Sequence, residues 1–140
     1  MALIQWQDAQ HALQTGWMDL IHHEFVALTN ALATSSEANE ATCLERLIGH
    51  CRDHFAQERM WMEISRMPST EHHLRDHEAI MAMLEGAMHD LREGRHGAGR
   101  DATDELVPWF EQHSSTLDAA LAFHLQQNMQ KDRPGIPAVG

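Results

Sequence analysis

Histidine is frequent in this chain, and several histidines have spacings that suit metal binding. The 140 residues include 12 histidines but only 2 cysteines. His54 and Glu58 are four residues apart, as are His73 and His77. On a helix this spacing places two side chains one turn apart on one face, so each pair can reach one metal ion. Imidazole and carboxylate ligands suit iron, whereas a thiolate cluster is absent from the sequence.

Two more histidines, in other segments, are candidates for the same site. His22 and His113 would each add one ligand. Asp118 lies five residues after His113, about 140° around an ideal α-helix, so helix geometry alone does not select it. One buried histidine would be an ordinary hydrogen-bonded core residue. Ligand-type residues from several segments need a joint explanation, because buried carboxylates are costly unless they are paired or bind a cation.

Helical periodicity predicts the elements that would carry these residues. Apolar residues recur at intervals of three and four over the ranges 14–33, 40–65, 71–92 and 101–127. All of the candidate ligands except Asp118 fall within these apolar stripes. The stripe of the last segment consists of Leu106, Trp109, His113, Leu117 and Ala120. Short connections favour antiparallel neighbours, so we expect an all-α fold, an up-down-up-down four-helix bundle with an N-terminal arm.

The breaks between the segments contain residues typical of turns and helix starts. Ser69 and Thr70 are possible N-caps, and Asp101 resembles an acidic cap at the start of the last helix. We expect three parts: an arm over residues 1–13, the bundle over 14–128 and a flexible tail over 129–140.

Composition excludes several classes of partner. The formal net charge is −11 and the 10 Lys and Arg residues are scattered, which argues against nucleic acid or an anionic membrane as a partner. No apolar run approaches the roughly 20 residues of a membrane span, and the first ten residues lack the pattern of a signal peptide. We therefore expect a cytoplasmic protein with Cys43 and Cys51 as unpaired thiols.

The motifs, taken in order, resemble those of the hemerythrin family. Trp6 fits an aromatic residue of the N-terminal arm in that family. Four helix motifs follow over most of the chain: Asp19-x-x-His22-x-x-Phe25, His54-Phe55-x-x-Glu58, His73-x-x-x-His77 and Trp109-Phe110-x-x-His113-x-x-x-x-Asp118. Each motif alone is a weak signal, but the ordered set of five histidines and two carboxylates is specific.

This resemblance implies reversible oxygen binding at a non-haem di-iron centre, for carriage, storage or sensing. His73, His77 and His113 would bind one iron, and His22 and His54 the other. Glu58 and Asp118 would bridge the two iron ions (Fe2+/Fe3+), with an oxo or hydroxo group as the third bridge. The iron with two histidines would keep an open position for O2 or for small ligands such as peroxide, nitric oxide or azide.

The resemblance also assigns a ligand pocket, and there this chain departs from the family. Phe25, Phe55, Trp109 and Phe110 would line the pocket together with residue 114. The family commonly has Ile or Leu at that position, whereas this chain has Ser114. The hydroxyl favours an alternative function, a di-iron peroxidase or an enzyme that handles nitric oxide. A passive metal-binding bundle is a third possibility. Of the three, the sequence favours a non-enzymatic oxygen-binding protein, but it does not exclude an enzyme.

The other histidines are expected outside the site. His22 is favoured over its neighbour His23 by the motif spacing, and His73 over His72 because only His73 pairs with His77. We expect His50, one turn before His54, to be half-buried or at the surface.

Overall fold

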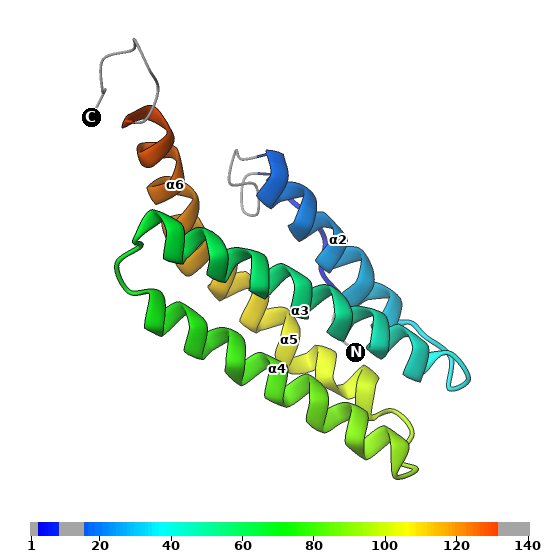
Figure 1. The fold of residues 1–140 in the computed structure, drawn as a ribbon. Coiled ribbons are helices and arrows are strands. Elements are labelled where there is room, and N and C mark those ends of the chain that lie inside the picture. Colours follow the sequence, from blue (N-terminus) through cyan, green and yellow to red (C-terminus); the bar gives the residue numbers. More distant parts are fainter. Residues whose placement is uncertain (1–2, 9–15, 132–140) are drawn as a thin grey trace.

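The fold is a bundle of four antiparallel helical rods (Figure 1). A computed structural model describes residues 3–8 and 16–131, so most of the expected C-terminal tail and part of the expected arm lie outside the described residues. The first three rods are α2 (Gly16–Ala33), α3 (Glu40–Ser65) and α4 (Thr70–Arg92). The fourth combines α5 (Ala98–His113), a π-helical turn η1 (Ser114–Asp118) and α6 (Ala119–Lys131). The predicted four-helix bundle is confirmed, and no strand occurs among the described residues.

Neighbouring rods in the sequence are neighbours in space. α3 packs against α2 on one side and α4 on the other, and α5 contacts both α2 and α4, which closes the bundle. Figure 1 shows α6 continuing past the α3–α4 connection, beyond the end of the other rods. This up-down arrangement turns one face of every rod toward a common interior.

The apolar core has two parts, separated by a polar layer. The larger part contains Phe25, Phe55 and Phe110, and the smaller part contains Met18, Met62 and Leu121. On three rods a ligand candidate lies between the two parts along the chain: His22 on α2, Glu58 on α3, and His113 with Asp118 on the fourth rod. The candidate ligands are thus enclosed by apolar side chains above and below, which excludes bulk water.

The π-helical turn changes the face that the end of the fourth rod presents to the core. The stripe predicted from α-helical periodicity included Leu117 and Ala120, but Leu117 is only half-buried and Ala120 is exposed. Asp118 and Leu121 are buried in their place. A π-turn hydrogen-bonds each residue to the fifth one along the chain, so it shifts the inward face by one residue.

The start of α5 is capped by Glu40, the first residue of α3, and not by Asp101. Glu40 is fully buried, and its carboxylate accepts hydrogen bonds from the backbone N–H groups of Gly97 (2.8 Å) and Arg100 (2.9 Å). Asp101 lies inside the first turn, because the helix begins at Ala98. Gly99 makes room for this contact, since a Cβ there would lie 3.2 Å from the Glu40 carboxylate. Of the two possible N-caps of α4, Ser69 occupies the N-cap position but makes no side-chain cap hydrogen bond. Thr70 lies inside the helix, and its hydroxyl donates to the Met67 carbonyl.

The described part of the N-terminal arm packs on α2. Asn30 binds both backbone groups of the buried Ile4, accepting from its N–H and donating to its carbonyl, each over 2.8 Å. The Trp6 ring lies on the exposed His23, with ring centroids 3.8 Å apart. The division of the chain into arm, bundle and tail stays a prediction.

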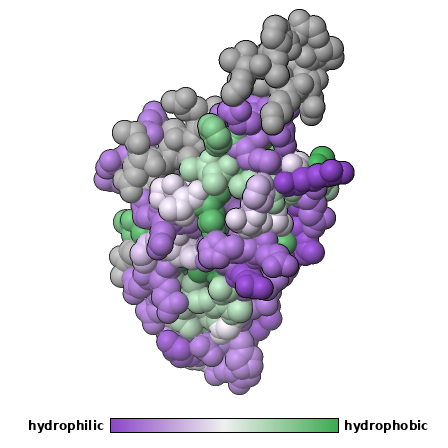
Figure 2. All heavy atoms as spheres, turned by 90° about the vertical axis from the view of Figure 1, so that its left-hand side faces the viewer, coloured by the Kyte–Doolittle hydropathy of each residue, from purple (hydrophilic) through white to green (hydrophobic). Residues whose placement is uncertain are grey.

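The face shown in Figure 2 is mostly hydrophilic and has separate hydrophobic patches. Within the described residues, no helix combines the length and apolar character needed to cross a membrane.

Candidate metal centre

The seven predicted ligands lie together inside the bundle, and none is more than 7% exposed. Their ligand atoms form two overlapping groups, and within each group these atoms lie within 4.8 Å of one another. The first group consists of Glu58, His73, His77, His113 and Asp118, and the second of His22, His54 and Glu58. One group thus has three histidines and the other has two.

The two carboxylates are shared between these groups of histidines. Glu58 places Oε1 3.2 Å from Nε2 of His73 and 3.2 Å from Nε2 of His77, while its Oε2 contacts Nε2 of His54. Asp118 places Oδ1 3.1 Å from Nε2 of His73 and 3.1 Å from Nε2 of His113. Its Oδ2 lies 3.0 Å from Nε2 of His22. Each carboxylate therefore directs one oxygen to either side, the arrangement that a bridge between two metal ions requires.

The charges of the cluster depend on one another. Burial and the Asp118 carboxylate raise the pKa of Glu58, but His54 and His73 outweigh them and hold that pKa well below its usual range. Burial also raises the pKa of Asp118, and His113, His22 and His73 outweigh it, so its pKa is well below the usual value. Burial lowers the pKa of His73, but Asp118 and Glu58 outweigh it and raise the pKa to about 9. Two buried anions thus require nearby positive charge, from protons or from metal ions.

Several polar atoms of the cluster lack a partner in hydrogen-bond geometry among the described residues. They are Nε2 of His22, Nε2 of His73, Oε1 of Glu58 and Oδ1 of Asp118. These atoms lie close to one another but are not aligned as donors and acceptors. Imidazole nitrogens and carboxylate oxygens that converge in this way fit a pair of cations such as iron, which would satisfy all of them.

Aromatic rings cover the cluster on the side of the larger core. Phe110 contacts His22 edge-on at 5.4 Å between centroids, and Phe25 stacks on Phe110 at 4.8 Å. Trp109 stacks on His113 at 4.5 Å. The structure therefore brings Phe110 and Trp109 against candidate ligands, with Phe25 packed on Phe110.

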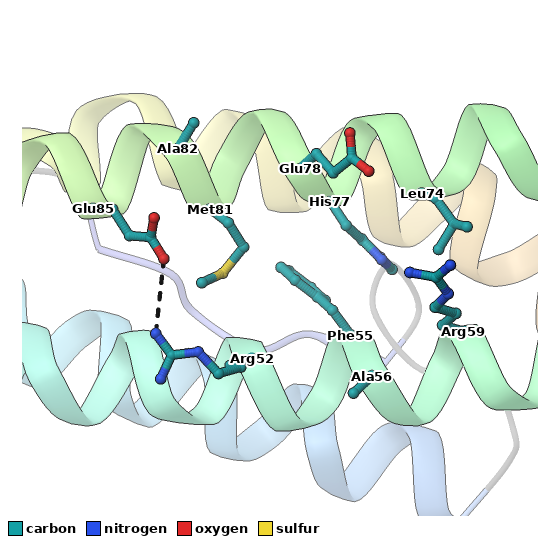
Figure 3. Close-up of a pocket in the computed structure, with 10 residues that line it drawn as sticks. All are labelled: Arg52, Phe55, Ala56, Arg59, Leu74, His77, Glu78, Met81, Ala82 and Glu85. Atoms are coloured by element: carbon teal, nitrogen blue, oxygen red, sulfur yellow. Dashed lines mark ion pairs between the residues drawn. The ribbon is translucent and has the colours of Figure 1, made fainter.

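Phe55, the fourth predicted pocket residue, lies between the cluster and a surface groove. Its ring stacks on His77 with centroids 3.9 Å apart and an interplanar angle of 8°. Figure 3 shows Phe55 and His77 extending from α3 and α4 into the gap between these helices, with an ion pair between Arg52 and Glu85 further along. Both rings line the groove, so the groove reaches a candidate ligand, His77.

Ser114 has a buried hydroxyl without a partner. The residue is 1% exposed, and its Oγ makes no hydrogen bond to any described residue. Its neighbours differ, because Ser115 donates to the Glu111 carbonyl (2.8 Å) and Thr116 to the Gln112 carbonyl (2.6 Å). The Ser114 hydroxyl is therefore available to a small ligand or a water molecule.

Among the described residues, the histidines expected outside the cluster are outside it. His23 and His72 are exposed, whereas their neighbours in the cluster are buried. His50 is half-buried, with its ring 5.7 Å from that of His54. Burial lowers the pKa of His50, and the nearby His54 lowers it further.

Sequence reasoning missed one residue next to the cluster. Asp76 of α4 accepts hydrogen bonds from Nδ1 of His113 and from Nε1 of Trp109. In the sequence Asp76 lies directly before His77 and three residues after His73, a spacing that places Asp76 near the face of His73 but does not reveal its contact with α5.

Fold and site together define a four-helix-bundle protein with a buried centre for two metal ions. No family model matches the chain. It is 34% identical over 127 residues to a bacteriohemerythrin from Ralstonia nicotianae, a match that covers 91% of this chain and 92% of that protein. The chain belongs to the hemerythrin family. Two crystal structures, of a wild-type hemerythrin and of a hemerythrin mutant, share the fold at a TM-score of 0.80, with 21% and 22% identity over 89% of this chain and 98% of each of those chains. Family, fold and cluster together support oxygen binding at a di-iron site.

Proposed function

We propose that this protein binds molecular oxygen reversibly, with two iron ions held by the seven clustered residues. The observation that carries this proposal is the sharing of two buried carboxylates between a group of three histidines and a group of two. When bound, a diferrous centre supplies the two electrons that reversible oxygen binding requires. The residues of this chain hold the iron, exclude water and shape the space for the ligand.

The ligand assignment follows the grouping of the side chains. His73, His77 and His113 would hold one iron, while His22 and His54 would hold the other. Glu58 and Asp118 would each bridge both, and an oxo or hydroxo group from solvent would complete the bridge. The side with two histidines has one protein ligand fewer, so the position for O2 is proposed there.

The rings near His22 would keep this position dry. Phe25 and Phe110 stack on each other, and Phe110 contacts His22 edge-on. Neither ring offers a proton or a hydrogen bond to a bound ligand, and both are nearly fully buried. A dry apolar wall slows the entry of water and anions, which favours release of the ligand as oxygen.

An enzyme that reduces peroxide or handles nitric oxide is the second candidate, and Ser114 favours it. A buried hydroxyl without a protein partner can hydrogen-bond to an anion or hold a water molecule near the iron. Either contact would shorten the lifetime of bound oxygen.

A cytoplasmic location, proposed from the sequence, fits two free cysteines in the structure.

The test is an optical spectrum of the iron-loaded protein, reduced without air, before and after oxygen is added. Reversible binding predicts a visible charge-transfer band that fades on degassing and returns with oxygen. If oxygen never produces such a band, even within milliseconds, oxygen carriage is wrong. Rapid, repeated turnover of added peroxide would favour the enzyme.

A further inference from the structure

Asp76 is a partly exposed carboxylate that binds the outer side of a candidate ligand. Its Oδ2 accepts a hydrogen bond from Nδ1 of His113 over 2.6 Å, while Nε2 of the same ring lies 3.1 Å from Asp118 inside the cluster. The side chain of Asp76 is 34% exposed, and that of His113 is 2% exposed. The contact therefore keeps a proton on Nδ1 and leaves the lone pair of Nε2 for the metal centre.

Trp109 completes the hold on this ring from a second direction. Its indole stacks on His113 at 4.5 Å with an interplanar angle of 18°, and its Nε1 donates to the same oxygen of Asp76 over 3.1 Å. The stacking fixes the plane of the imidazole, and the hydrogen bond to Asp76 fixes its rotation within that plane. Because Asp76 lies on α4 and both donors lie on α5, the contact also joins the two helices that carry the three-histidine group.

Three of the four other histidines of the cluster are held differently. Nδ1 of His22, His54 and His77 has no hydrogen-bond partner among the described residues. An imidazole that donates from Nδ1 to a carboxylate is a stronger electron donor through Nε2, and such outer partners typically change metal affinity about 10–100-fold. A negative charge next to one ligand also stabilises Fe3+ relative to Fe2+.

We propose that Asp76 is a positioning residue of the metal centre, which holds His113 in its ligand orientation and lowers the reduction potential of the iron that His113 binds. This inference rests on the proposed di-iron site. It adds a residue outside the seven ligands and gives the two irons different electronic environments.

The experiment compares the wild type with three variants. Asp76→Asn keeps the size and one acceptor oxygen but removes the charge, and Asp76→Ala removes the acceptor as well. Glu78→Gln is the matched control, because it removes the same charge from an exposed position of the same helix, beside the α3–α4 groove (Figure 3). For each protein we would measure the irons per chain, the midpoint potential by optical titration and the melting temperature without metal.

Asp76→Asn should raise the midpoint potential. If the preference for Fe3+ over Fe2+ falls tenfold, the midpoint potential rises by about 59 mV for a one-electron step. Asp76→Ala should weaken metal binding by about 10–100-fold. Its metal-free melting temperature should fall as well, because the variant also loses the hydrogen bonds that join α4 and α5. Glu78→Gln should shift the potential much less. An equal shift in Glu78→Gln, or none in Asp76→Asn, would overturn the inference. A wild type that binds fewer than two irons would contradict the metal centre itself, a result visible before any variant is compared.

Discussion

Glu58 and Asp118 come from different rods, yet each places one carboxylate oxygen on either side of the cluster. Oε1 of Glu58 and Oδ1 of Asp118 both lie near His73, at 3.2 and 3.1 Å. Their second oxygens lie near His54 and His22, respectively. The two acids therefore connect the two histidine groups.

Replacing the proposed bridging carboxylate of Glu58 should reduce iron binding more than replacing a nearby histidine. Glu58→Ala should weaken iron binding by at least about 100-fold, beyond the range typical of outer partners, because both groups lose an oxygen. The matched control is His50→Ala, which changes a histidine one turn before His54 that belongs to neither group. Metal analysis after gel filtration checks both proteins. Equal iron contents in the two variants would show that Glu58 does not bridge.

Metal should stabilise the fold, because seven polar groups are buried in an apolar bundle. Free metal at 100 times its dissociation constant adds about 2.7 kcal/mol for one site. For a chain of this length that corresponds to a rise of roughly 5–10 °C in melting temperature. Calorimetry of the metal-free protein, and of the same sample with Fe2+ added under argon, measures the difference. A melting temperature indifferent to metal would contradict a buried metal centre.

Ser114 should set how long the oxygen complex survives. Ser114→Leu replaces the unpartnered hydroxyl with an apolar side chain, so the variant should oxidise more slowly in air and admit azide more slowly. One charge-assisted hydrogen bond, worth about 1.5–3 kcal/mol, corresponds to a change of at least roughly tenfold. Ser115→Leu is the control, because that neighbouring side chain is exposed and already bonded to a backbone carbonyl. Unchanged rates in a Ser114 variant that holds two irons would place the hydroxyl outside the ligand's reach.

Glu40 should stabilise the metal-free fold at neutral pH and lose this effect in acid. Burial raises the pKa of Glu40, but the N–H groups of Arg100 and Gly97 outweigh it and lower the pKa below 4.5, its ordinary value. A lowered folded-state pKa means that the stabilisation is fully present above that ordinary value. It is lost as the pH falls through the lower folded-state pKa.

Glu40→Gln tests this contribution, because the amide NH2 would face backbone N–H donors. The variant should lose about 1–3 kcal/mol of unfolding free energy at pH 7. The difference from the wild type should shrink below about pH 4.5. Urea unfolding of both metal-free proteins over a range of pH measures it, with Glu37→Gln, an exposed acid before the same helix, as the control. A difference that does not vary with pH would show that the charge of Glu40 has no part in capping α5.

The sequence by itself determined much of the site, because helix periodicity is local. The i, i+4 spacing of His54 with Glu58, and of His73 with His77, requires only a helix to bring each pair together. The apolar stripes then predicted that these pairs face a common interior. The resemblance of the ordered motifs to hemerythrins added Asp118, which periodicity had not selected.

Tertiary structure decided the contacts that depend on a local departure from the α-helix or on a partner far along the chain. Asp118 joins His113 because η1 is a π-turn, which brings residues five apart onto one face. Glu40 and Asp76 resemble ordinary surface acids in the sequence. They bind their partners, 57 and 37 residues away, only because α5 packs beside the start of α3 and along α4. A single helix segment carries no information about such neighbours, since they depend on how whole helices pack.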